Sequence, residues 1–363
     1  MADGSNTGQH APPRPLAPRS RGGRHVLVTG GAGYVGAVLV PMLLEQGDRV
    51  TVVDRLYWGS APLASVLDRI RLIHADVRAL APGMLAGVDA VVHLAGLSND
   101  PTAEWAPEAN WQMNALATER LADACLAAGV QRLTYGSSAS IYDGLPASCV
   151  YDERAKVEPR GAYSTSKYYG EQALQARGSD AFCPVILRQG TVYGYSPRMR
   201  YDLVVNTFLK DALSVGRLAL HGGGWMWRPL VDVTDVARAH IAALEAPAER
   251  VRGEVFNVLN DNYQIRQLAM LVAGSAQLFG HAVALEEAPL PQFVRDYRCT
   301  KRKAEEQLGF TAHVTPLESI AGMLDRIRAN GARDFSHPRF YNIAWMTLLA
   351  EVQPNLVPFV GVT

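Results

Sequence analysis

Tyr163 and Lys167 are the residues whose types and spacing most clearly indicate chemistry. They stand four positions apart in the segment YSTSK at 163–167, so a helix would place them on one face. A free phenol has a pKa of about 10, and it needs a downward shift of roughly three pKa units to act as a base near pH 7. An adjacent ammonium supplies part of that field. The pair therefore predicts an acid–base centre, although such spacing also occurs by chance on ordinary helices.

A group of hydroxyls upstream supports the acid–base interpretation. The strand-like segment 132–136 is followed by Ser137, Ser138, Ala139 and Ser140. The carboxyl ends of strands are the usual ligand side of a parallel sheet. We therefore expect these serines to lie near the Tyr163 helix.

Three glycines near the start of the chain predict a phosphate-binding turn. Gly30, Gly33 and Gly36 in the segment TGGAGYVG at 29–36 follow a strand-like run and open a predicted helix. Without side chains they permit a tight turn and a close approach of a pyrophosphate to the backbone. The amides at the helix N-terminus would then face the phosphates.

Asp54 turns the glycine motif into a specific cofactor prediction. It ends the next predicted strand, about 20 residues beyond the glycines, where a carboxylate accepts both hydroxyls of an adenosine ribose. A carboxylate repels a 2′-phosphate, so the pattern favours NAD over NADP. Arg55 follows immediately and leaves NADP open, because a guanidinium stacks on adenine or pairs with a phosphate. A bound nicotinium ring would complete the field around Tyr163.

Apolar runs alternating with helical patterns predict an α/β fold, a doubly wound parallel sheet of Rossmann type with a smaller C-terminal substrate-binding lobe. The predicted strands are 25–29, 49–54, 70–74, 90–94, 132–137 and 181–188, with a helix over 111–128. The predicted units are a disordered tail at 1–24, the NAD-binding domain at 25–193 with a return segment near 228–262, the lobe at 194–227 and 263–330, and an extension at 331–363. We expect that extension to serve packing or self-association.

Composition excludes several other classes of protein. The 363 residues include 48% hydrophobic side chains, and the 35 basic residues equal the 35 acidic ones, which argues against disorder throughout and against a nucleic-acid partner. The uncharged run 26–44 is interrupted by glycines, so no membrane association is expected. Four scattered cysteines (Cys125, Cys149, Cys183 and Cys299) without a CxxC pair indicate reduced thiols and a cytoplasmic location. No spacing indicates a metal site.

Taken together, these segments resemble the extended short-chain dehydrogenase/reductase superfamily, and within it the NAD-dependent nucleotide-sugar epimerases and dehydratases related to UDP-glucose 4-epimerase. The resemblance covers about residues 25 to 330. Its motifs are TGGAGYVG at 29–36, Asp54, Asp76-Val77, HLAG at 93–96, SSAS at 137–140, YSTSK at 163–167, Leu187-Arg188, VYG at 192–194 and RPLVDV at 228–233. The resemblance implies a nucleotide-sugar substrate and a homodimer.

The resemblance also implies a role for each matching position. Tyr163 would be the acid/base, Lys167 would hold the nicotinamide ribose and lower the pKa of Tyr163, and Ser138 would bond the reacting oxygen. The remaining cofactor contacts would come from Gly30, Gly33, Tyr34, Val35, Gly36, Asp54, Arg55, Asp76, Val77, Leu94, Ala95 and Gly96. Substrate contacts would come from Ser138, Ser140, Asn114, Thr191, Asn206 and Arg228. Trp225, Trp227, Arg295 and Arg298 are lower-ranked candidates for the nucleotide pocket.

Departures from the family pattern narrow the chemistry. Ala139 and Ser140 stand where the 4,6-dehydratases carry an Asp-Glu pair, so elimination of water lacks its acid and base. Thr191 replaces an asparagine that is usual in 4-epimerases. Asp202 falls near a phosphate-binding asparagine and would repel a diphosphate, a task that Asn206 is placed to take over. The absence of the Asp-Glu pair favours an NAD-dependent epimerase acting at C4 over a dehydratase, whereas Thr191 and Asp202 depart from the epimerase pattern in the substrate contacts. The alternatives are an NAD(P)H-dependent keto-sugar reductase and a non-catalytic NAD-binding module.

Overall fold

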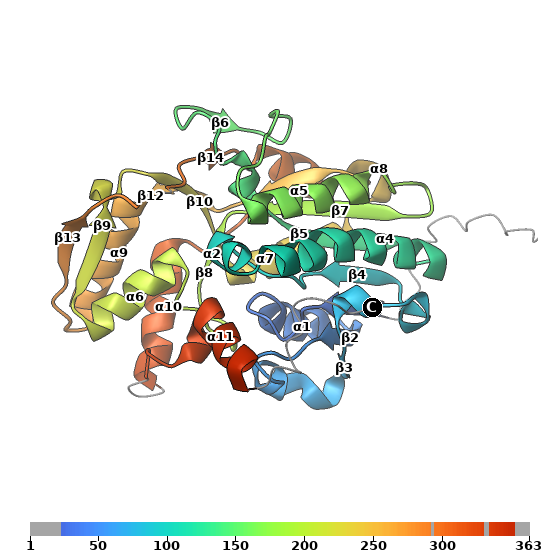
Figure 1. Cartoon of the computed structure of the whole chain (residues 1–363), viewed down its shortest axis with the longest axis horizontal. Coiled ribbons are helices and arrows are strands. Elements are labelled where there is room, and N and C mark those ends of the chain that lie inside the picture. The colour runs from blue at the N-terminus through green and yellow to red at the C-terminus, as the bar shows by residue number, and fades with distance from the viewer. Residues whose placement is uncertain (1–22, 292–293, 330–333, 353–363) are drawn as a thin grey trace, which may run out of the picture.

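A parallel seven-stranded sheet forms the centre of the computed structural model, which describes residues 23–291, 294–329 and 334–352 (Figure 1). The strand order is β11-β7-β5-β4-β1-β2-β3. The strands are β1 (His25–Thr29), β2 (Arg49–Asp54), β3 (Arg71–His74), β4 (Ala90–His93), β5 (Arg132–Ser138), β7 (Cys183–Gln189) and β11 (Val255–Val258). The order reverses beside β1, which is the switch point where such sheets bind ligands. The predicted doubly wound parallel sheet is confirmed.

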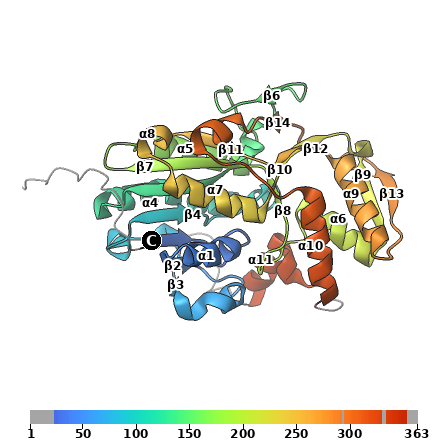
Figure 2. The same ribbon diagram turned by 180° about the vertical axis from the view of Figure 1, so that it is seen from behind.

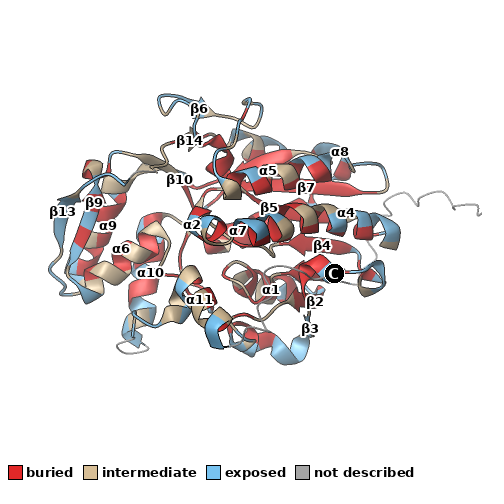
Figure 3. Cartoon of the chain, viewed as in Figure 1, coloured by how far each residue is buried: buried red, intermediate tan, exposed pale blue. Residues whose placement is uncertain are grey.

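The central strands of the sheet are largely buried (Figure 3), and their alternating side chains build a core on each face. Leu27, Val91 and Leu133 belong to one buried cluster, whereas Val26 and Val92 belong to a cluster on the opposite face. This division follows from the two-residue period of a strand. Both faces are apolar, so both must be covered by helices.

Two layers of helices cover the sheet. One layer contains α4 (Ala117–Ala128) and α5 (Ala162–Gln175), which lie toward the viewer in Figure 1. The other contains α1 (Gly36–Glu45) and α7 (Val233–Glu245), seen from behind in Figure 2. The shorter helices are α2 (Asp100–Trp105), α3 (Pro107–Asn110) and α8 (Ala248–Val251).

The helix predicted over 111–128 differs from the structure in its first part. Residues Trp111–Leu116 wind as a π-helix, and α4 begins only at Ala117. π-turns accommodate one extra residue per turn and are frequent at functional sites. Here the wider turn carries Asn114, whose side chain contacts Leu97.

A second lobe lies beyond the carboxyl ends of the strands (Figure 1). It holds a three-stranded sheet in the order β12-β10-β8 and a parallel pair of β13 with β9. Its elements are β8 (Thr191–Tyr193), α6 (Val204–Ser214), β9 (Arg217–His221), β10 (Trp227–Asp232), β12 (Asp261–Gln264), α9 (Ile265–Leu278), β13 (Ala284–Ala288) and α10 (Pro316–Ala329). A separate pair joins β6 (Val150–Tyr151) to β14 (Arg298–Cys299).

The described end of the chain returns to the first unit. Helix α11 (Asn342–Val352) follows a loop that contacts the segment after β2. Trp345 Nε1 donates to the Tyr57 carbonyl at 2.7 Å, and Trp58 Nε1 donates to the Arg339 carbonyl at 2.9 Å. The extension predicted to serve packing or self-association therefore packs within the chain over 334–352. The tail predicted at 1–24 falls outside the described residues except for 23 and 24.

Within the described ranges, no helix has both the length and the apolar character needed to cross a bilayer. All four cysteines are free thiols. The same ranges contain no cluster of three His, Cys, Asp or Glu side chains placed to hold a metal ion.

Candidate active site

A cavity of about 280 Å³ lies where the carboxyl ends of the strands meet the second lobe. Most of the residues singled out in the sequence line it. These are Gly30, Gly33, Tyr34, Val35, Gly36, Asp54, Arg55, Val77, Leu94, Ala95, Gly96, Ser138, Tyr163, Lys167 and Thr191. Asp76, Asn114, Ser140, Asn206 and Arg228 lie outside its lining.

The glycine turn between β1 and α1 leaves a cradle that larger residues would fill. Gly30 has φ +72°, and a Cβ there would lie 2.7 Å from the backbone nitrogen of Ala95. A Cβ on Gly36 would lie 2.5 Å from the Gly30 carbonyl oxygen. The turn can therefore bring backbone amides and the N-terminus of α1 against a pyrophosphate.

Asp54 closes the adenosine end of the cradle. Its carboxylate accepts the Ala32 amide at 2.9 Å and the Leu56 amide at 2.7 Å. Burial raises the pKa of Asp54, and these two hydrogen bonds oppose the rise. Each carboxylate oxygen keeps lone pairs that can accept ribose hydroxyls. The glycine cradle and this acceptor together fit a dinucleotide.

Asp76 lies behind the adenosine end of the cavity instead of in its wall. Its carboxylate binds the Arg78 guanidinium through contacts of 2.7 and 3.0 Å and also caps the Arg78 amide. Burial opposes ionisation, but the hydrogen bonds from Arg78 hold the pKa of Asp76 below its usual value. Asp76 thus positions the loop whose next residue, Val77, lines the cavity.

Asn114 fixes the loop after β4 from behind. Its Oδ1 accepts the Leu97 amide and its Nδ2 donates to the Leu97 carbonyl, both at 2.8 Å. The side chain is fully buried. The asparagine expected at the substrate therefore supports the backbone that carries Leu94, Ala95 and Gly96.

Ser138, Tyr163 and Lys167 meet on one wall of the cavity. Ser138 ends β5, while Tyr163 and Lys167 stand one turn apart near the start of α5. Lys167 Nζ donates to the Gly136 carbonyl at 2.9 Å, which ties α5 to β5. Ser138 Oγ donates at 2.9 Å to the hydroxyl of Ser140, a buried residue behind it.

Burial dominates the ionisation of Tyr163 and Lys167. It raises the pKa of Tyr163 to about 12, while hydrogen bonding to Ser138 and the charge of Arg200 act in the opposite direction. Burial also lowers the pKa of Lys167 to about 8, against the influence of Glu171. The protein groups alone therefore leave the phenol protonated at neutral pH. A lowering of the pKa by Lys167 together with the charge of a bound nicotinium stays a prediction.

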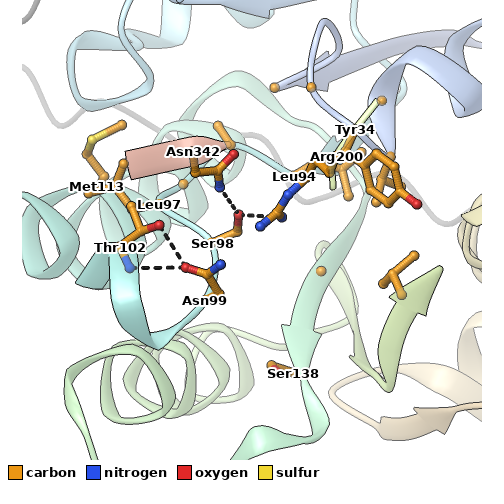
Figure 4. Close-up of a pocket in the computed structure, with 18 of the residues that line it drawn as sticks. Tyr34, Leu94, Leu97, Ser98, Asn99, Thr102, Met113, Ser138, Arg200 and Asn342 are labelled. Atoms are coloured by element: carbon orange, nitrogen blue, oxygen red, sulfur yellow. Dashed lines mark hydrogen bonds between the residues drawn. The ribbon is translucent and has the colours of Figure 1, made fainter. Parts of the chain in front are cut away.

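Two arginines from the loop after β8, Arg198 and Arg200, line the cavity. Arg200 donates to Ser98 Oγ at 2.9 Å, and Asn342 of α11 donates to the same oxygen at 3.0 Å (Figure 4). Arg200 also pairs with Asp202 at 2.8 and 3.1 Å. Asp202 is therefore neutralised, so the predicted repulsion of a diphosphate is offset. The sequence interpretation missed three residues of the cavity lining, Arg198, Arg200 and Asn342. The two arginines could have been suspected because they lie just after the VYG motif. No sequence pattern marks Asn342.

Two of the remaining candidates, Asn206 and Arg228, lie outside the cavity lining and form hydrogen bonds with other residues of the protein. Asn206 accepts the Gly194 amide at 3.1 Å and donates to the Tyr34 hydroxyl at 3.1 Å. Arg228 donates to the carbonyls of Trp227 and Arg295. Arg295 itself lines the cavity, whereas Trp225, Trp227 and Arg298 do not.

Comparisons with known proteins converge on one family. Residues 26–258 match the model of the NAD dependent epimerase/dehydratase family. The chain is 29% identical over 312 residues to a UDP-glucose 4-epimerase of Corynebacterium glutamicum, covering 81% of this chain and 93% of that protein. It is 30% identical over 317 residues to a UDP-glucose 4-epimerase of Mycolicibacterium smegmatis, covering 83% and 98%.

Solved structures give the same result. MoeE5 in complex with UDP-glucuronic acid and NAD superposes with a TM-score of 0.73 at 28% identity, covering 85% of this chain and 100% of that one. The UDP-glucose 4-epimerase of Thermus thermophilus in complex with NAD gives a TM-score of 0.73 at 27% identity, with the same coverage.

Proposed function

We propose that this chain, which belongs to the NAD dependent epimerase/dehydratase family, inverts C4 of a nucleotide sugar through a transient 4-keto intermediate. Members of this family are NAD-dependent enzymes of the nucleotide-sugar epimerase and dehydratase type. NAD, held by the glycine turn, Asp54 and Lys167, would supply the hydride acceptor for oxidation at C4 and the hydride donor for the re-reduction. The protein must then move one proton and hold the sugar oxygen.

The observation that carries the proposal is the set of polar groups on the cavity wall. Tyr163 and Ser138 line the cavity together with Lys167. Among the described lining residues, Asp54 is the single carboxylate, and its oxygens accept the Ala32 and Leu56 amides at the adenosine end. Loss of water from a sugar needs a proton donor and a base at neighbouring carbons. This wall favours oxidation and re-reduction over elimination.

Each of the three side chains has a defined task in this mechanism. Tyr163 takes the proton of the C4 hydroxyl and later returns it, once the charge of the bound cofactor has lowered the pKa of the phenol. Ser138 hydrogen-bonds the same oxygen and keeps it close to Tyr163. Lys167, held by the Gly136 carbonyl, binds the nicotinamide ribose and so fixes the cofactor beside the sugar.

The test is proton NMR of UDP-, dTDP- and GDP-sugars incubated with the enzyme in D₂O. We expect the C4 epimer to form without deuterium at C4 and without net change in the reduced-nicotinamide absorbance. Stoichiometric loss of that absorbance with a ketone would instead indicate a reductase. An enzyme that holds NAD but converts none of these sugars would contradict the proposal.

Tyr163→Phe tests the proton step directly. Acid–base catalysis contributes about 10²- to 10⁴-fold to a rate, so we expect kcat to fall by at least 100-fold while NAD content is retained. Tyr169→Phe is the matched control, because Tyr169 lies on the same helix and its hydroxyl donates to Glu119 outside the cavity. Turnover of Tyr163→Phe within tenfold of wild type would remove Tyr163 from the mechanism.

A further inference from the structure

Arg198 is a buried guanidinium whose hydrogen-bonding capacity is only partly used. The residue is 5% exposed, and its guanidinium carbon lies 3.8 Å from the centroid of the Trp58 ring. Its Nη2 donates to Asn342 Oδ1 at 2.5 Å. Its Nε and Nη1 are buried without a hydrogen-bond partner among the described residues. Such donors are normally satisfied, so their state indicates a missing acceptor.

Arg198 also lacks a counter-ion within the described part of the chain. The nearby Asp202 is engaged by Arg200 through both carboxylate oxygens and by the Asn342 amide at 3.2 Å. Burial lowers the pKa of Arg198 to about 9, and the charge of Arg200 adds to this effect. An unpaired buried charge is strongly unfavourable, so an anion is expected to complete the site.

The place of Arg198 in the cavity indicates which anion completes the site. Arg198 lines the same cavity as the glycine turn and Asp54, and its guanidinium stacks on Trp58, another lining residue four positions beyond Asp54. This contact places Arg198 beside the segment that follows β2 at the adenosine end. Arg200, in contrast, reaches Ser98 and affects Tyr163 at the reaction end.

We propose that Arg198 binds the pyrophosphate of NAD from the side opposite the glycine turn, and that Asn342 and Trp58 hold its guanidinium there. The cofactor would then lie between backbone amides on one side and a fixed positive charge on the other. This inference concerns cofactor retention and does not depend on which sugar carbon is inverted.

The C-terminal segment supplies the support for Arg198. Asn342, the first residue of α11, accepts from Arg198 and donates to Ser98. The contacts of Trp345 with Tyr57 and of Trp58 with Arg339 fasten the same segment beside the cofactor cavity. Residues 334–352 thereby become part of the dinucleotide site.

The experiment compares Arg198→Met with wild type by calorimetric titration of NAD-stripped protein. The ligands are NAD, ADP and adenosine, of which the first two contain a diphosphate. A hydrogen bond to a charged group contributes about 1.5–3 kcal/mol, so NAD and ADP should each bind about 10- to 100-fold more weakly. Adenosine binding should be unchanged. NAD released on denaturing the purified variant should fall in parallel.

Two further variants keep the test decisive if Arg198→Met folds poorly. Asn342→Ala leaves the arginine but removes its acceptor, and should weaken NAD and ADP binding by a smaller factor. Arg326→Met is the matched control, since Arg326 also stacks on an aromatic ring, that of Tyr195 at 4.3 Å, outside the cavity lining.

Three results would overturn the proposal. One is wild-type affinity of Arg198→Met for NAD and ADP. Another is an equal loss of adenosine binding, which would indicate a structural role. The third is an increased KM for the nucleotide sugar with unchanged NAD binding, which would assign Arg198 to the substrate's diphosphate. The titrations with NAD, ADP and adenosine do not require that C4 inversion be correct, so failure of this proposal is distinguishable from failure of the proposed function.

Discussion

Replacing Glu171 with glutamine should destabilise the protein because it leaves a buried arginine without its counter-ion. Glu171 lies one turn beyond Lys167 on α5 and is 1% exposed. It accepts three hydrogen bonds from Arg188 nitrogens, at 2.7, 3.0 and 3.2 Å, and one from the Ser137 hydroxyl at 2.5 Å. The Arg188 side chain is only 4% exposed. Together these residues join α5 to β5 and β7 directly beneath the reaction centre.

The expected loss follows from the burial of both partners. Removing one member of a buried ion pair typically costs about 3–5 kcal/mol, because the other charge stays in a poorly solvated site. We therefore expect Glu171→Gln to lower the free energy of unfolding by about that amount. The control is Glu119→Gln, since Glu119 pairs with Arg177 at 3.1 Å with side chains 31% and 21% exposed. Exposed pairs contribute about 0–1 kcal/mol.

Urea unfolding followed by circular dichroism measures both changes. The double variant Glu171→Leu with Arg188→Met should recover much of the loss, because replacing a buried pair by apolar residues is often neutral. A loss below about 1 kcal/mol in Glu171→Gln, or equal losses in Glu171→Gln and Glu119→Gln, would refute the reasoning that this pair is strongly coupled by burial.

Two further predictions concern the cofactor cradle and the lysine. Gly36→Ala should greatly weaken NAD binding in titration calorimetry and destabilise the protein by about 1–3 kcal/mol, because its Cβ would lie 2.5 Å from the Gly30 carbonyl oxygen. The control is Gly274→Ala in α9, where an added Cβ would meet nothing within 4 Å. This variant should stabilise the protein by up to about 1 kcal/mol. Equal changes in stability and NAD affinity in the two variants would contradict the proposed clash at Gly36. Since burial lowers the pKa of Lys167 to about 8, its ammonium is lost as pH rises, and kcat/KM should fall above about pH 8. Because Glu171 raises the pKa of Lys167, the decrease in kcat/KM should begin at a lower pH in Glu171→Gln. A wild-type kcat/KM that stays constant up to about pH 10 would show that the charge of Lys167 is not needed.

Local patterns in the sequence predicted the parts of the site that depend on neighbours along the chain. The turn from β1 to α1 needs a glycine at 36 because a Cβ there would meet the Gly30 carbonyl oxygen in the same turn. The close approach of Gly30 to Ala95, after β4, was not part of that local pattern. Tyr163 and Lys167 share a helix face, and Ser138 ends the neighbouring strand. The alternation of strands and helices along the sequence predicted a parallel sheet, so the glycine turn, Ser138 and the start of the Tyr163 helix were expected at the same edge of that sheet.

The parts that sequence could not predict depend on contacts between distant segments. Arg228 lies outside the cavity lining, where it bonds the Arg295 carbonyl and lies near the Tyr297 ring, almost 70 residues further on. Asn342 reaches Ser98 across a separation of 244 residues. Helix α11 has an apolar composition with no motif, so its packing onto Tyr57 and Trp58 is visible only in three dimensions.

The position of α11 has a consequence for synthesis of the chain. Domains form from the N-terminus as the chain emerges, at about 5–20 residues per second, so the glycine cradle can take shape early. The wall that Asn342 and Met346 contribute arrives only after roughly 300 further residues have left the ribosome. Stable loading with dinucleotide should therefore be a late event in biogenesis, and ribosome-bound intermediates halted before residue 342 should exchange NAD freely.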